Sequence, residues 1–212
     1  MRIEYCPSAV SPTRSAAPTS KTLFRLHSEH TAPRTRAEHA YAQLNSAWSV
    51  VVRSPAPPRA IAILTAHWAL ETDGGRAMPG HNFAGIKAAA AARGAELQTV
   101  EGYGPARREV TARFRVYDSA EAGARDYVHL LASRFPAALE AACAGNPAGF
   151  AQALAQGGYF TADPAAYSAG LEQRLHALEG GAPQNPNQRP GALLQMALAG
   201  VLGALRQRPE DA

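Results

Sequence analysis

A glutamate at the end of an apolar helical pattern is the first residue of this sequence that could do acid chemistry. Ile61, Leu64 and Trp68 recur at helical spacing, and at about 100° per residue Glu71 falls about 20° from Leu64 and about 60° from Trp68. A carboxyl group on that face would lose hydration, and desolvation favours its neutral form. A neutral carboxylic acid can protonate the oxygen of a glycosidic bond as the bond breaks. The alternative is a glutamate that pairs with an arginine or caps the following loop.

A second carboxylate, Glu101, stands where a strand pattern meets a glycine turn. The segment LQTVE precedes the turn EGYGPA, and REVTARFRVY follows it with alternating apolar and polar residues, which is typical of a half-buried hairpin strand. Glycoside cleavage commonly uses two carboxyl groups, one as acid and the other as base, nucleophile or charge stabiliser. Glu71 and Glu101 could form such a pair, although an ordinary solvated hairpin glutamate would show the same pattern.

Aromatic residues gather near these carboxylates in the sequence. Flat rings pack against sugar faces, and a phenol can also donate a hydrogen bond. Core packing is the better single explanation for Trp68 and Phe83, whereas Tyr159 and Tyr167 lie in the segment GGYFTADPAAY, whose glycines and proline mark a loop that enters a helix. The candidate substrate-binding aromatic residues are Trp68, Phe83, Tyr103 and Tyr167.

Metal and cofactor chemistry lacks a recognisable pattern. His67 and Glu71 are four residues apart and share a helix face with His81 nearby, but the HExxH motif is absent and neither cysteine has zinc-type spacing. The sequence contains no GxSxG, Walker or GxGxxG motif. We therefore expect neither a metal ion nor a cofactor.

The elements that must position these residues are mostly helices. Periodicity predicts a helix over 36–52, a second helix between the proline-rich SPAPPR and Gly74, and further helices beginning near Asp118 and spanning 136–144, 147–156 and 164–179. The period-2 segment within 97–117 is the exception. The fold class is therefore mainly α (α+β), a helical domain with one small β-hairpin lobe, and two carboxylates on different lobes could face each other across a cleft.

Charge and composition divide the 212 residues. Residues 1–59 carry eight Lys or Arg and three Asp or Glu, a net charge of +5. Residues 60–180 carry ten basic and twelve acidic residues, a net charge of −2, and residues 181–212 carry three basic and two acidic residues, a net charge of +1. The overall net charge is therefore +4. We expect a basic, flexible tail over 1–36, a catalytic domain over 37–179, a linker over 180–191 and a short amphipathic helix over 192–212. Because the basic excess lies in the tail, the charge does not indicate nucleic-acid binding.

Five blocks in order resemble one enzyme family. ILTAHWALETDGGR, HNFAGIKA, TVEGYG, FRVYDSAEAGARDYVHLL and FAQALAQGGYFTADPAAYSAGLEQRL resemble the glucosaminidase domain of glycoside hydrolase family 73, found in flagellar-rod muramidases and autolysins. The resemblance implies a lysozyme-like fold, with Glu71 as general acid, Glu101 as its partner in the β lobe and Tyr159 as an active-site tyrosine. Asn82 falls in the asparagine-containing loop after the catalytic helix and is a further candidate substrate-binding residue. Asp73-Gly74 and Ala84 depart from the family pattern, and Asp73 could alter the charge near Glu71.

The resemblance implies a peptidoglycan hydrolase that cuts between N-acetylglucosamine and N-acetylmuramic acid. Two other activities remain open: cleavage of the lytic-transglycosylase type, with anhydro-sugar products, and a wall-binding or assembly module without turnover. The first residues lack the apolar run of a secretory signal, and the apolar stretch 192–205 is shorter than a membrane span. We therefore expect action in the periplasm or cell wall after export by a nonclassical route, with a secretion, motility or phage-type apparatus as a possible partner.

Overall fold

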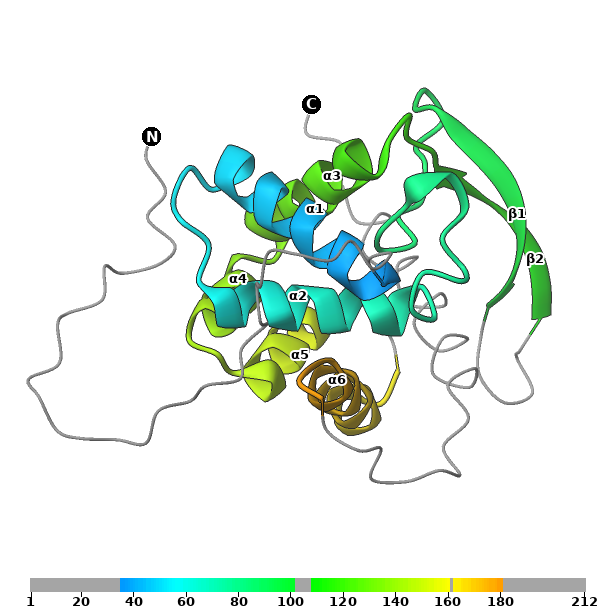
Figure 1. Cartoon of the computed structure of the whole chain (residues 1–212). Coiled ribbons are helices and arrows are strands. Elements are labelled where there is room, and N and C mark those ends of the chain that lie inside the picture. The colour runs from blue at the N-terminus through cyan, green and yellow to red at the C-terminus, as the bar shows by residue number, and fades with distance from the viewer. Residues whose placement is uncertain (1–34, 102–107, 161, 181–212) are drawn as a thin grey trace, which may run out of the picture.

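Six helices and a two-stranded antiparallel sheet make up the part of the chain that the structure describes, residues 35–101, 108–160 and 162–180 of a computed structural model (Figure 1). The mainly helical fold class with a small β hairpin is confirmed. The elements are α1 (Arg36–Val51), α2 (Pro58–Glu71), a short 3-10 helix (Pro79–His81), β1 (Gly94–Glu101), β2 (Arg108–Arg115), α3 (Ala120–Arg134), α4 (Pro136–Cys143), α5 (Pro147–Gln156) and α6 (Pro164–Leu178).

Local sequence signals set where the helices begin. Thr35 and Glu38 form a capping box at the start of α1, in which the Thr35 side chain accepts from the Glu38 N–H and the Glu38 carboxylate accepts from the Thr35 N–H. Helices α2, α4, α5 and α6 each have proline in the first turn, where a missing N–H costs nothing. The predicted helices over 36–52, 136–144, 147–156 and 164–179 are therefore confirmed to within one residue at each end.

Helix α2 is the central element of the bundle. The sequence pattern predicts a buried stripe, but every residue from Ala60 to Glu71 is buried. The reason is that α1, α4 and α6 pack against different sides of α2, so that no face is left to solvent. Figure 1 shows α2 running through the middle of the bundle, with its carboxyl end toward the side that carries the β hairpin.

The hairpin pairs β1 with β2 over eight residues each, from Gly94 opposite Arg115 to Glu101 opposite Arg108. The alternation predicted for β2 is present: Val110 and Ala112 are half-buried and Phe114 is buried, whereas Thr111 and Arg113 are exposed. β1 begins at Gly94, before the predicted LQTVE. A Cβ at Gly94 would lie 2.8 Å from the Phe114 carbonyl oxygen and 2.7 Å from the Ala88 Cβ, so a residue without a side chain permits this close approach.

Several predictions fall outside the described residues. These are Tyr103, the tail before Thr35, the linker beyond Gly180 and the C-terminal helix over 192–212. The proposed domain limits of 37–179 remain a prediction, although the described helices extend from Arg36 to Leu178. No helix in the described part of the chain has the length and apolar character needed to cross a membrane.

Candidate active site

Glu71 is the last residue of α2 and is only 2% exposed. The carbonyl end of a helix carries partial negative charge, so this position does not stabilise a carboxylate. Oε1 of Glu71 accepts a hydrogen bond of 2.5 Å from the hydroxyl of Tyr167 on α6. Oε2 is buried and has no hydrogen-bond partner among the described residues. One oxygen is thus held by the protein, and the hydrogen-bonding capacity of the other is unused within the described residues.

His67 lies one turn before Glu71 and is fully buried. Its Nε2 is 2.6 Å from the Tyr167 hydroxyl, and its Nδ1 is 2.5 Å from the hydroxyl of Tyr127 on α3. Nε2 is also 3.5 Å from Oε1 of Glu71. Four side chains from three helices therefore form one continuous polar chain, Tyr127–His67–Tyr167–Glu71, inside the core.

The tyrosines of this buried cluster are held in their neutral form. Burial raises the pKa of Tyr127, Tyr159 and Tyr167 well above the usual value, and Glu71 raises each further whenever its carboxyl group is ionised. The hydroxyls of Tyr127 and Tyr167 therefore keep their protons at neutral pH and can act as hydrogen-bond donors.

Tyr159, the predicted active-site tyrosine, lies beside this chain and is not hydrogen-bonded to Glu71. Its ring centroid is 5.2 Å from that of His67 and 5.3 Å from that of Phe135. Its hydroxyl donates to the Ala84 carbonyl at 3.2 Å. Tyr159 thus connects the loop that follows α2 to the segment before α6, and its role toward a substrate stays a prediction.

Trp68 and Phe83 face the protein interior in this structure. They are 2% and 1% exposed, and their ring centroids are 6.1 Å apart. The indole N–H of Trp68 donates to the Met78 sulfur at 3.1 Å. Both rings therefore support the loop after α2 from the core side, and a sugar could stack on them only after a rearrangement.

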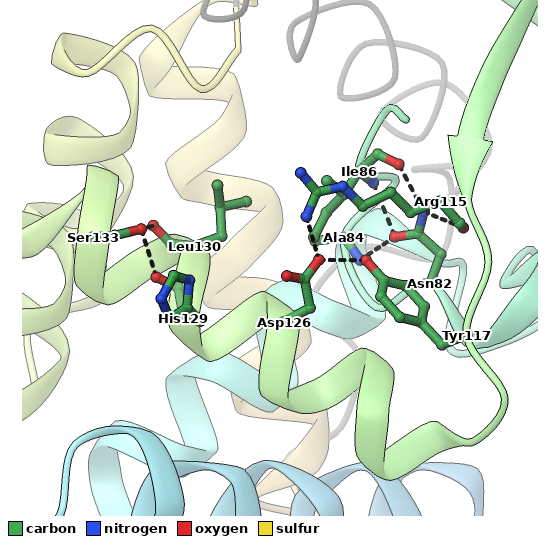
Figure 2. A network of polar contacts seen from close by, with 9 residues as sticks. All are labelled: Asn82, Ala84, Ile86, Arg115, Tyr117, Asp126, His129, Leu130 and Ser133. Atoms are coloured by element: carbon green, nitrogen blue, oxygen red, sulfur yellow. Dashed lines mark hydrogen bonds and ion pairs between the residues drawn. The ribbon is translucent and has the colours of Figure 1, made fainter. Parts of the chain in front are cut away.

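Asn82 also engages the backbone. Its amide nitrogen donates to the carbonyls of Ile86 and Arg115, at 2.9 and 3.0 Å, while its oxygen accepts from the N–H groups of Ile86 and Ala84. Figure 2 shows the Asn82 side chain between its own loop and the end of β2. The Arg115 side chain continues the network to Asp126 on α3, at 2.7 Å, where the Tyr117 hydroxyl also donates. Asn82 thus ties the loop to the hairpin.

The two predicted residues of the hairpin can be placed only in part. Glu101 is the last residue of β1, in register with Arg108, and its side chain lies outside what the structure describes, as does Tyr103. The structure therefore brings Glu71, Tyr167 and Tyr159 together around His67, and leaves the pairing of Glu71 with Glu101 as a prediction.

Asp73, which departs from the family pattern, is paired with arginines. Both of its carboxylate oxygens accept from Arg76, at 2.8 and 3.0 Å, and Arg174 on α6 lies 3.5 Å away. The hydrogen bond from Arg76 lowers the pKa of Asp73 below its usual value, and both arginines add to that effect. Asp73 is therefore ionised at neutral pH, and its negative charge is paired with the positive charges of Arg76 and Arg174.

Within the described residues, no group of three or more His, Cys, Asp or Glu side chains is arranged to hold a metal ion. His67 has both ring nitrogens engaged with tyrosine hydroxyls. What the site offers chemically is a buried carboxyl group with one oxygen bonded by a phenol and the other without a partner.

Comparison with protein families decides the relationship. Residues 58–179, or 122 of the 212 residues, match the family described as glucosaminidase, mannosyl-glycoprotein endo-beta-N-acetylglucosaminidase. The chain belongs to the glucosaminidase family. It is a glycoside hydrolase, as the five sequence blocks predict, and the matched region holds both Glu71 and the polar chain around His67.

Solved structures agree with this membership. Two structures of a peptidoglycan hydrolase from Sphingomonas sp. A1 are similar to this chain. The first, a mutant, has 29% sequence identity and a TM-score of 0.55, and the match covers 68% of this chain and 95% of the hydrolase. The second has 27% sequence identity and a TM-score of 0.50, and the match covers 71% of this chain and 96% of the hydrolase. The catalytic domain of the autolysin Auto from Listeria monocytogenes shares the fold at 19% identity and TM-score 0.51, covering 70% and 88%. No curated protein is similar enough to this glucosaminidase to count as a relative.

Sequence reasoning missed the buried polar partners of Glu71. It weighed His67 only as a metal ligand, which the absence of an HExxH motif argues against, and it gave Tyr127 no role in the site. The i, i+4 spacing of His67 and Glu71 does place both on one face of α2. The hydroxyls that meet His67 come from positions 60 and 100 residues away, so local spacing carries no signal for them.

Proposed function

We propose that this glucosaminidase is a peptidoglycan hydrolase, that it cleaves the glycosidic bond between N-acetylglucosamine and N-acetylmuramic acid, and that Glu71 is its general acid. The observation that carries the proposal is the state of Glu71 at the end of α2, which is buried, bonded at Oε1 and unpartnered at Oε2. Family membership supports the reaction type. The similar Sphingomonas proteins are peptidoglycan hydrolases, which supports the substrate class.

In the proposed reaction, the proton of the Glu71 carboxyl passes to the glycosidic oxygen while the bond from that oxygen to the sugar carbon breaks. The bonding electron pair stays with the leaving oxygen, and positive charge develops on the sugar. Glu101, carried on the hairpin, stabilises this charge or activates the incoming water. Tyr159 orients the substrate or polarises its acetamido group. Because Oε2 is itself buried, neighbouring atoms must move before a substrate oxygen reaches it.

The products of peptidoglycan digestion test the proposal. Purified glycan strands incubated with the protein should yield new reducing ends, and mass spectrometry should show one added water per cleaved bond. Anhydro-sugar ends would instead assign a lytic transglycosylase. Binding to wall material without any product would assign a non-catalytic module.

A glycoprotein substrate is the second candidate, because the family description names a mannosyl-glycoprotein endo-beta-N-acetylglucosaminidase. Parallel incubation with a high-mannose glycoprotein distinguishes the two. Glycan release from that protein without peptidoglycan cleavage would contradict the peptidoglycan assignment while leaving the glycosidase chemistry intact.

Peptidoglycan lies outside the cytoplasmic membrane, so this function places the enzyme in the periplasm or cell wall. We also propose that the basic residues 1–36 direct the chain to a secretion, motility or phage-type apparatus, since most of the excess positive charge lies in the N-terminal part. A reporter fused to residues 1–36 should leave the cytoplasm of the native host. Retention of both the reporter and the intact enzyme in the cytoplasm would contradict this proposal.

A further inference from the structure

We propose that Tyr127, His67 and Tyr167 form a one-way hydrogen-bond chain that reserves Oε1 of Glu71 as an acceptor and leaves Oε2 as the oxygen that carries and delivers the catalytic proton. The proposal rests on the proposed role of Glu71 as general acid. It assigns His67 and Tyr167 as positioning residues, a role that differs from metal binding and from sugar contact. The three partners come from α3, α2 and α6, which Figure 1 shows as separate helices of one bundle.

The direction of the chain follows from counting protons, beginning at its far end. Within the described residues, the hydroxyl of Tyr127 has Nδ1 of His67 as its hydrogen-bond partner. Its single proton must therefore point at Nδ1, because a buried donor without an acceptor is costly. Nδ1 is then an acceptor, and in a neutral imidazole the proton belongs to Nε2.

The same count continues to Glu71. The Nε2–H group of His67 donates to the Tyr167 oxygen at 2.6 Å, and the Tyr167 proton is free to point at Oε1 of Glu71 at 2.5 Å. Every O–H and N–H group of the chain then has an acceptor, and every proton points toward Glu71. Oε1 accepts, so the proton of a neutral Glu71 carboxyl sits on Oε2, which has no partner among the described residues.

If the hydrogen bonds of the chain ran in the opposite direction, away from Glu71, one buried proton would have no acceptor within the described residues. If Oε1 donated to Tyr167, then Tyr167 would donate to Nε2 and the Nδ1–H group would donate to Tyr127. The hydroxyl proton of Tyr127 would then have no acceptor within the described residues. A doubly protonated His67 meets the same obstacle at Tyr127 and also places a positive charge in the core.

The chain also favours release of the proton. Once Oε2 has passed its proton to the glycosidic oxygen, Glu71 is a carboxylate, and a hydrogen bond to an ionised acceptor is about twice as strong as one to a neutral acceptor. Tyr167 therefore stabilises the product state of the transfer more than the starting state. Among the described residues, the titratable side chains that contact Glu71 or interact with its charge are His67, Tyr127, Tyr159 and Tyr167.

The first test reads the tautomer of His67 directly. In the full-length protein labelled with nitrogen-15 at histidine, the ring signal that disappears in His67→Gln identifies His67 among the seven histidines. We expect a neutral ring protonated on Nε2 at neutral pH. A ring protonated on Nδ1, or on both nitrogens, would overturn the proposal whatever the enzyme's activity.

The second test uses kinetics. Tyr167→Phe should lower kcat on peptidoglycan about tenfold with KM nearly unchanged, and should move the alkaline limb of the pH profile up by about one pH unit, because the lost bond favours the ionised carboxylate. His67→Leu should also lower kcat and move the alkaline limb of the pH profile to higher pH. His67→Gln, which keeps one donor and one acceptor, should restore most of the rate. A folded Tyr167→Phe with the kcat and pH profile of the parent would overturn the proposal.

A matched control separates this effect from general loss of stability. Tyr117→Phe also removes a 2.5 Å bond from a phenol to a carboxylate, that of Asp126, and should leave the alkaline limb in place. The outcomes also separate the two proposals. An active Glu71→Gln protein defeats the general-acid assignment, whereas an inactive Glu71→Gln beside a normal Tyr167→Phe defeats the chain alone.

Discussion

Replacing Glu71 with glutamine is expected to lower kcat for glycosidic cleavage by about two to four orders of magnitude, the usual contribution of a general acid. The amide keeps the size of the side chain and an oxygen that can accept the hydrogen bond from Tyr167. It cannot deliver a proton to a leaving oxygen. KM should change little, since the variant removes an interaction that strengthens in the transition state. The measured quantity is the rate at which new reducing ends form from peptidoglycan. Binding of the products is measured in a separate assay.

Glu140→Gln is the matched control for this variant. Glu140 lies on the exposed side of α4, so the same chemical change should leave both the rate and the thermal midpoint near those of the parent. Thermal unfolding of Glu71→Gln shows whether the fold survives. A folded Glu71→Gln protein with the parental rate would remove Glu71 from the mechanism, and the polar chain around it would then be a feature of the core only.

The fold was predictable because local residues determine where its helices and strands begin and end. Pro58, Pro147 and Pro164 each stand in the first turn of a helix, where proline has the right backbone angle and no needed N–H. The alternation from Val110 to Phe114 carries the period of a strand. Such signals act over a few residues, so a single sequence reveals them.

The environment of Glu71 was predictable only in part. Helical spacing places it on the apolar face, and the structure indeed buries it. The complete burial of α2 depends on where α1, α4 and α6 pack. The hydrophobic periodicity within α2 does not indicate these packing positions. The tyrosine partners of His67 likewise depend on contacts across 60 and 100 residues.

Two predicted substrate contacts illustrate the same limit. Trp68 and Phe83 are aromatic and lie three and twelve positions from Glu71 in the sequence, within the region where a sugar-binding residue would be sought. In the structure their rings contact one another in the core. Ring type and sequence neighbourhood therefore identify the region of the site, whereas exposure, which separates a packing ring from a binding ring, is set by the tertiary fold.

Asn82 gives the second large effect, on stability. Asn82→Asp is nearly isosteric and keeps the oxygen that accepts from the Ile86 and Ala84 N–H groups. It loses the amide protons that bond the carbonyls of Ile86 and Arg115, and sets a carboxylate oxygen against those carbonyl oxygens at a position that is 2% exposed. We expect a loss of about 3–5 kcal/mol in the free energy of unfolding, since an unpaired buried charge adds to the two lost bonds.

The corresponding drop in thermal midpoint is about 6–20 °C for a chain of this size, measured by calorimetry or circular dichroism. Asn45→Asp makes the same change at an exposed position of α1 and should stay within about 0.5 kcal/mol of the parent. If Asn82 acts through the backbone, the folded fraction of Asn82→Asp at low temperature should keep the parental KM. A raised KM with an unchanged midpoint would instead make Asn82 a substrate contact, because a residue that holds the loop to β2 cannot lose its donors without destabilising the fold.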